Sequence, residues 1–273
     1  MTKKPPLTWR QAIPTLITLA AMLCGFFSIL MTLESLRNGV DVGRAHLWAA
    51  QLIMLAMILD GIDGNVARRL KGCSALGSEL DTYVDMTAFG IAPALLIYVV
   101  NERGPLFWRV VMTAAVVLSG VVRLARFKAS DIHRGQDGFS GLPITACAGW
   151  VATLVFLSET ASPGHFLSLQ RHPMQSVFLA GILVFIVLQV SNIRYPKPTK
   201  VTALFLPMVV LVGLLFVPDA RYSVPAASVM VLLGVGYALL GPLYMWHATR
   251  RLARRRRQEV LPPPVTEGAA HER

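Results

Sequence analysis

The chain has 273 residues, of which 54% are hydrophobic and only 15% are charged. An ordinary soluble domain carries about 25% charged residues, so this composition excludes a protein built from ordinary soluble domains and indicates an integral membrane protein. The net charge of +11 is not gathered in a stretch polar enough to fold as a basic module, and we expect no nucleic-acid partner.

Eight apolar segments follow one another along the chain, each long enough to cross a bilayer, which takes about 17–25 residues. They must be helices, because lipid does not satisfy an exposed backbone. The first is longer than the apolar part of a signal peptide and is interpreted as a retained span. The expected fold is all-α, a polytopic integral membrane helix bundle with about eight transmembrane helices near residues 13–35, 45–67, 78–100, 106–127, 141–160, 175–193, 201–218 and 224–246.

The distribution of basic residues predicts the orientation of these spans. With an even number of spans, 20 of the 26 Lys and Arg residues lie on the side that holds both termini. Positive residues concentrate on the cytoplasmic side of membrane proteins. We therefore expect a multi-pass protein of the inner (cytoplasmic) membrane with both termini in the cytoplasm. The run Arg250–Arg257 is interpreted as a contact with anionic lipid headgroups.

Five of the 15 acidic residues are concentrated between Asp60 and Asp85, next to strongly apolar segments. At the end of the second predicted helix, one helical face carries Asp60, Asp63, Gly64, Ala67 and Arg68. This face would lie at the cytoplasmic side of the membrane.

The third predicted helix repeats the pattern with Gly77, Asp81 and Asp85 at intervals of four residues. The connection between the two helices, residues 70–76, is short, so we expect antiparallel neighbours whose acidic faces meet. Single acidic residues of this kind are often solvated, but such a register on two adjacent helices favours a common site.

Four converging carboxylates near a membrane repel one another unless they are protonated or share cations. Oxygen ligands without His or Cys suit Mg²⁺, Mn²⁺ or Ca²⁺. A pair of such ions is a frequent arrangement for displacement at phosphorus. Gly64, Ala67 and Gly77 would leave room for a bulky ligand.

The pattern D-x2-D-G-x2-A-R-x8-G-x3-D-x3-D is present in full, and in it the chain resembles the CDP-alcohol phosphatidyltransferases. The resemblance implies a core of six spans, often in a homodimer, that transfers a phosphatidyl group from a CDP-linked lipid to an alcohol and releases CMP. It implies a divalent cation cofactor, Mg²⁺ or Mn²⁺ and two per site. It further implies that Asp60, Asp63, Asp81 and Asp85 bind metal, that Asp85 is the catalytic base, and that CDP lies among Asp60, Gly64, Ala67, Arg68 and Gly77.

Stretches beyond this motif resemble the phosphatidylserine synthase branch of the family, namely FGIAPALL from Phe89, RLARF from Arg123, FSGLPITA from Phe139 and SNIRYPK from Ser191. They imply CDP-diacylglycerol and L-serine as substrates. An arginine grips a carboxylate in a bidentate manner, so Arg123, Arg126 and Arg194 are candidates for binding the acceptor. Other acceptors, glycerol 3-phosphate or inositol and its phosphate, remain open. A divalent-cation or proton-coupled transporter is an alternative of another class.

The expected organisation has three parts. Residues 1–200 form the six-helix catalytic membrane domain, residues 201–249 add two transmembrane helices, and residues 250–273 form a basic, disordered cytoplasmic tail.

Overall fold

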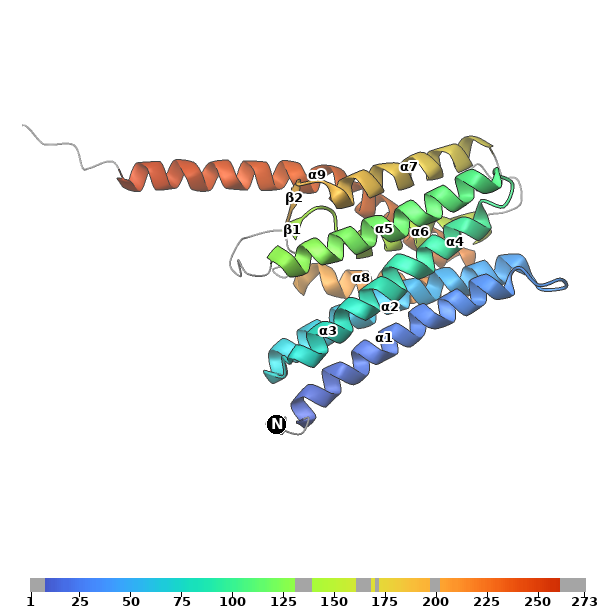
Figure 1. Cartoon of the computed structure of the whole chain (residues 1–273), viewed down its shortest axis with the longest axis horizontal. Coiled ribbons are helices and arrows are strands. Elements are labelled where there is room, and N and C mark those ends of the chain that lie inside the picture. Colours follow the sequence, from blue (N-terminus) through green and yellow to red (C-terminus); the bar gives the residue numbers. More distant parts are fainter. Residues whose placement is uncertain (1–7, 131–138, 161–167, 170–171, 197–201, 261–273) are drawn as a thin grey trace, which may run out of the picture.

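A computed structural model gives the architecture of the chain, and it describes residues 8–130, 139–160, 168–169, 172–196 and 202–260 (Figure 1). Within these residues the fold is helical apart from one two-stranded ribbon. The elements are α1 (Trp9–Glu34), α2 (Val42–Leu70), α3 (Ala75–Val84), η1 (Asp85–Ile91), α4 (Ala92–Val100), α5 (Leu106–Ser130), β1 (Phe139–Ser140), α6 (Ile144–Thr160), α7 (His172–Val190), β2 (Arg194–Tyr195), α8 (Thr202–Leu215) and α9 (Ala220–Val260).

The predicted polytopic helix bundle is confirmed. Six helical segments of the described chain are long and apolar enough to cross a membrane, and they include the rod that α3, η1 and α4 form together over residues 75–100. The two other predicted spans, in α6 and α8, are shorter apolar helices. Nearly all side chains of α6 are buried, so this helix is surrounded by protein along most of its 17 residues.

Helix α1 organises one side of the bundle, because it packs against α2, α3, η1 and α4. Small residues make its contact with α2 close, and the Ser28 hydroxyl donates a hydrogen bond to the Ala49 carbonyl at 2.8 Å. Small side chains and hydroxyl groups at helix contacts are typical of membrane bundles, where association depends on packing and hydrogen bonds. Helix α6 fills the interior and contacts α2, η1 and α9.

A π-helical segment, η1, interrupts the third rod between α3 and α4 and begins at Asp85. A π-helical turn holds more residues than an α-helical turn, so the rod changes its register here. The segment lies directly against α1, where a Cβ atom on Gly25 would be only 2.7 Å from the Cα and Cβ atoms of Ala88. Gly25 therefore permits a close approach of α1 to η1, in the middle of the third rod.

The ribbon pairs β1 with β2 in antiparallel register, with Phe139 opposite Tyr195 and Ser140 opposite Arg194. Gly141 follows β1 with a φ angle of +81°, and a Cβ atom there would be 2.3 Å from the Gln189 carbonyl oxygen. The Gly141 amide donates to the Ile193 carbonyl at 2.8 Å. The ribbon thereby fastens the entry to α6 onto the chain that leaves α7.

The end of the chain differs from expectation. Helix α9 continues through the basic run to Val260, whereas a disordered tail was expected from residue 250. Arginine and leucine are good helix formers, and no proline interrupts the run before Pro262. In Figure 1 this part of α9 extends beyond the rest of the bundle. Residues 261–273 lie outside the described residues.

Two glycine substitutions test the contact between α1 and η1. Gly25→Ala should lower the thermal unfolding temperature, because the added methyl group must displace the backbone of Ala88. Gly213→Ala is the matched control, since a Cβ on that helical glycine meets nothing within 4 Å. The control should be neutral or stabilising by up to about 1 kcal/mol. Equal unfolding temperatures for the two variants in one detergent would contradict the close contact.

Candidate active site

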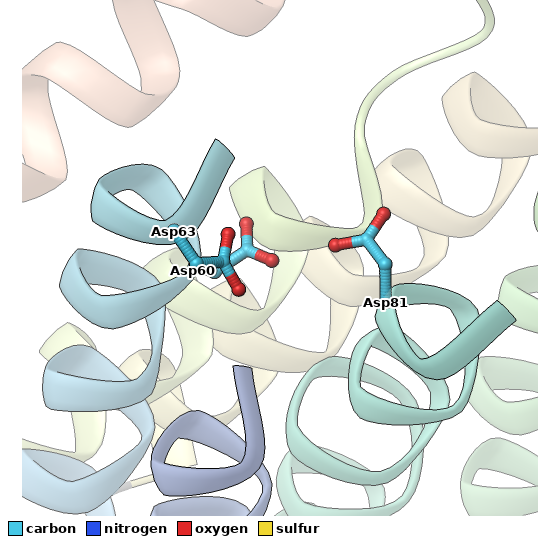
Figure 2. A group of neighbouring side chains, drawn as sticks. All are labelled: Asp60, Asp63 and Asp81. Carbon is cyan, nitrogen blue, oxygen red and sulfur yellow. The ribbon is translucent and has the colours of Figure 1, made fainter. Parts of the chain in front are cut away.

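Three carboxylates from two helices meet at one end of the bundle. Asp60 and Asp63 project from α2 and Asp81 projects from α3, and Figure 2 shows the carboxylates of the two helices directed toward one another. One oxygen from each of the three side chains lies within 4.8 Å of the others. The structure therefore confirms the prediction that the acidic faces of the two helices meet.

The chain folds in this way because the turn between α2 and α3 is strongly specified. Lys71 ends α2 in the left-handed conformation at φ 52°. The Ser74 hydroxyl then accepts a hydrogen bond from the Gly77 amide at 3.0 Å and caps the start of α3. Gly72 has no room for a side chain, since a Cβ atom would be 2.0 Å from the Arg10 carbonyl oxygen. The start of α1 thus holds the turn that sets the distance between the acidic faces.

The donor set fits a hard divalent cation. Two oxygens bound to one ion are separated by at most twice the metal–oxygen distance, about 4 Å for Mg²⁺ and about 5 Å for Ca²⁺. The 4.8 Å group satisfies this limit for the larger ion and needs only small side-chain rotations for the smaller one. Asp63 is buried with 5% of its surface exposed, and a buried carboxylate requires a compensating charge or hydrogen bonds.

Helix α1 contributes a residue that no sequence motif indicated. The Thr18 hydroxyl donates to Oδ2 of Asp63 at 2.5 Å, and both side chains are buried. The same hydroxyl lies 3.0 Å from the Pro14 carbonyl, the ordinary partner of a helical threonine. Its single proton therefore has two acceptors, one within the helix and one at the site. Threonines that bond to their own helix are common in apolar helices, so the sequence alone did not indicate that Thr18 would contact Asp63.

Asp85 is a near neighbour of the group of three, but its carboxylate is not among the oxygens that lie within 4.8 Å of one another. Its carboxylate lies 4.0 Å from a guanidinium nitrogen of Arg123, and both side chains are largely buried. Asp85 is also the first residue of η1, so it stands where the third rod changes register. The structure thus places the predicted base beside one of the predicted acceptor ligands, and the other three aspartates form a group that could hold a metal ion.

The predicted nucleotide-binding positions have different surroundings beside the aspartates. A Cβ atom on Gly64 would meet only the guanidinium group of Arg68, at 3.6 Å. Arg68 is exposed and donates to the Asn65 side chain at 2.9 Å, while Ala67 is half-buried. On the other helix, Gly77 also has a local reason to be glycine, since a Cβ there would be 3.2 Å from the Ser74 hydroxyl.

The three predicted acceptor ligands have different surroundings. Arg123 is buried beside Asp85, with 8% of its surface exposed. Arg126, one turn later, donates to the Val190 carbonyl and to the Asn192 side chain, and it reaches the Ser140 hydroxyl at 3.4 Å. It therefore binds the end of α7 and the ribbon. Arg194 is exposed on β2.

One further ion pair closes the edge of the site. Lys128, near the end of α5, lies 2.5 Å from the carboxylate of Glu79 on α3. Glu79 is therefore paired with Lys128 and is not one of the three carboxylates that meet at the site. Because both side chains are exposed, this pair contributes little to stability.

Known proteins resemble the chain over most of its length. A relative from Helicobacter pylori (strain 26695) named CDP-diacylglycerol–serine O-phosphatidyltransferase is 33% identical over 237 residues, which cover 85% of this chain and 91% of the relative. A protein of the same name from Saccharomyces cerevisiae is 32% identical over 149 residues, 51% of this chain and 52% of the relative. An archaetidylserine synthase from Methanothermobacter thermautotrophicus is 29% identical over 191 residues, 68% of this chain and 70% of that protein.

The match to a protein family includes every residue of the acidic site. Residues 11–191 match the family model described as CDP-alcohol phosphatidyltransferase, and this range runs from the start of α1 to the end of α7. It contains the complete motif from Asp60 to Asp85 and also Thr18. The chain therefore belongs to the CDP-alcohol phosphatidyltransferase family.

Proposed function

We propose that this protein transfers the phosphatidyl group of CDP-diacylglycerol to the hydroxyl group of L-serine, giving phosphatidylserine and CMP. Membership of the family supports the reaction class, and the names of the relatives from Helicobacter pylori and Saccharomyces cerevisiae support the two substrates. The observation that carries the proposal is the group of three carboxylates held within 4.8 Å by two helices of one matched motif.

Asp60, Asp63 and Asp81 are the residues that would hold divalent cations, with Asp85 as a further ligand. We expect Mg²⁺ or Mn²⁺, two per site, and Ca²⁺ is compatible with the oxygen set. When bound, such ions neutralise the diphosphate and the charge that develops on the departing CMP. Gly64, Ala67, Arg68 and Gly77 would surround the nucleotide, with Arg68 close enough to Gly64 to contact a phosphate beside it.

Asp85 is proposed as the general base. It takes the proton from the serine hydroxyl as the serine oxygen attacks the phosphorus that carries diacylglycerol. The bond between this phosphorus and the bridging oxygen of the diphosphate breaks, and the electron pair leaves with CMP. Arg123, 4.0 Å from Asp85, is placed to bind the serine carboxylate next to the base. Arg194, on β2, is the second proposed acceptor ligand.

Helix geometry supports catalysis at the membrane surface. Asp60 follows the start of α2 at Val42 by 18 residues, or about 27 Å along a helix. This length is close to the hydrocarbon thickness of a bilayer, about 30 Å. The aspartates would then lie at the depth of the lipid headgroups, where the diphosphate of a membrane-bound lipid is found.

The positions of the basic residues support an active site at the cytoplasmic face of the inner membrane, with both termini on that side. Labelling of introduced cysteines in intact cells tests this orientation. Every residue of the proposed site lies within residues 1–200, and α8 and α9 follow them in the chain.

A homodimer is also expected. Light scattering by the detergent-solubilised protein gives its mass and tests whether it is a dimer.

The first prediction concerns the cation group. Mn²⁺ should raise the unfolding temperature of the wild-type protein, and Asp81→Asn should remove most of this rise because it takes away one ligand of the group. Glu79→Gln is the control, since it removes a carboxylate from the same helix whose partner is Lys128. A rise in Asp81→Asn as large as that of the wild type would contradict the site.

The second prediction concerns the acceptor. Purified protein with CDP-diacylglycerol should release CMP with L-serine, and much less with glycerol 3-phosphate, myo-inositol or inositol phosphate. Asp85→Asn should lower kcat by about 10²–10⁴-fold, the usual contribution of a general base, and should remain folded. Faster release of CMP with one of the other alcohols than with L-serine would overturn serine as the acceptor. Near wild-type turnover by Asp85→Asn would overturn the base assignment.

The third prediction concerns Thr18. Thr18→Val keeps the shape of the side chain but loses the hydrogen bond to Asp63, so the Mn²⁺ concentration for half-maximal activity should rise by about 2–10-fold, the effect of one ordinary hydrogen bond. Thr18→Ser should restore the wild-type value. Thr32→Val is the matched control, because this buried threonine of α1 bonds only to its own helix, at the Ser28 carbonyl. An unchanged requirement in Thr18→Val would exclude a positioning role.

A further inference from the structure

The position of α9 raises a question that the family match leaves open. The matched range ends at residue 191, before β2, α8 and α9. Helix α9 nevertheless packs against α6 in the interior and against β2. Part of the chain outside the match is thus in contact with the ribbon beside the site.

Two tyrosines join α9 to the ribbon in a reciprocal manner. The Tyr195 hydroxyl, from β2, donates to the Ala238 carbonyl of α9 at 3.2 Å. The Tyr237 hydroxyl, from α9, donates to the Pro196 carbonyl next to β2 at 3.1 Å. The two rings pack together with centroids 5.6 Å apart. We refer to Tyr195 and Tyr237 with these contacts as the tyrosine clasp.

The clasp is a closely fitted contact. Tyr195 is fully buried, and it is the largest of the fully buried side chains of the described residues. A Cβ atom on Gly241 would be 3.0 Å from the Tyr195 ring and 3.4 Å from Pro196, so glycine at this position makes room for α9 to pass close to β2. A buried tyrosine whose hydroxyl is bonded specifies one orientation of its segment, because an unpaired hydroxyl in this apolar position would be costly.

The segment held by the clasp is bound on its other side by Arg126. This side chain donates to the carbonyl groups of Val190 and Ser191 and to the Asn192 side chain. Arg126 lies one helical turn after Arg123, which is 4.0 Å from Asp85. A continuous series of contacts therefore runs from the proposed base through α5 to residues 190–196 and on to α9. Tyr237 also lies near Arg123.

We propose that Tyr195 and Tyr237 are positioning residues for the acceptor side of the active site, and that α9 is part of the catalytic unit rather than an addition to it. The clasp fixes residues 190–196, which anchor Arg126 and carry Arg194. The nucleotide and cation side of the site is built by α1, α2 and α3 and does not depend on the clasp. This inference rests on the proposed function, because it assigns one substrate to each side of the site.

The test uses full-length enzyme in nanodiscs and the variants Tyr195→Phe, Tyr237→Phe and the double variant. Each variant keeps the ring and loses a hydroxyl hydrogen bond. In the double variant the KM for serine should rise by about 3–10-fold, as expected when one or two ordinary hydrogen bonds are lost from a positioning contact. The KM for CDP-diacylglycerol and the stabilisation by Mn²⁺ should change less than about two-fold. Tyr244→Phe, an exposed tyrosine of α9, is the matched control.

A second measurement does not depend on turnover. Hydrogen exchange of the Gly141 and Ser191 amides, which are bonded within the clasped region, should become several-fold faster in the double variant. Exchange across α2 and α3 should be unchanged. Unaltered exchange at Gly141 and Ser191, or equal rises in the KM of both substrates, would overturn the proposal.

These measurements also distinguish a failure of the tyrosine clasp proposal from a failure of serine as the acceptor. If the wild-type enzyme uses another alcohol in place of serine, the substrate assignment fails, and the KM comparison is made with that alcohol. A rise confined to the KM of the alcohol then still supports the clasp, and an unchanged KM overturns it.

Discussion

Electrostatic repulsion among carboxylates at a membrane interface is the constraint on which this structure depends. Two unit charges about 5 Å apart repel by about 3 kcal/mol at an effective dielectric constant of about 20. Asp60, Asp63 and Asp81 form three such pairs, about 10 kcal/mol in total, which is comparable with the stability of a whole domain. A fold that holds these side chains together must compensate this repulsion with cations, protons or hydrogen bonds.

Several local features meet this requirement. The turn at Lys71 and Gly72 and the cap at Ser74 fix the positions of the two acidic helices, so backbone geometry holds the carboxylates together against their mutual repulsion. Thr18 donates a hydrogen bond to the most buried of them, and Arg123 balances the charge of Asp85. The remaining negative charge is the property that a divalent cation site requires. The negative charge that makes these carboxylates repel one another is therefore also the charge that would bind the cations in the proposed reaction.

In the proposed mechanism the two substrates bind to different parts of the fold. The cation and nucleotide side is built from α1, α2 and α3, which are close together in sequence and share one short turn. The acceptor side is built from α5, the end of α7, the ribbon and α9, which meet only in three dimensions. If this division holds, the acceptor side can change without disturbing the side that would bind the cations and the nucleotide.

The sequence by itself determined the membrane helices, their approximate limits and the meeting of the acidic faces, because apolar length and helical spacing are local properties of the chain. It also indicated the oxygen-ligand chemistry, which follows from residue type. Only the tertiary structure decided that Thr18 bonds to Asp63, that Arg126 binds the end of α7 whereas Arg123 faces Asp85, and that Tyr195 and Tyr237 join β2 to α9. It also extended α9 through the basic run that had been expected to be a disordered tail. These contacts link residues up to 64 positions apart, and no local pattern specifies which of several similar side chains will be brought together when the helices pack.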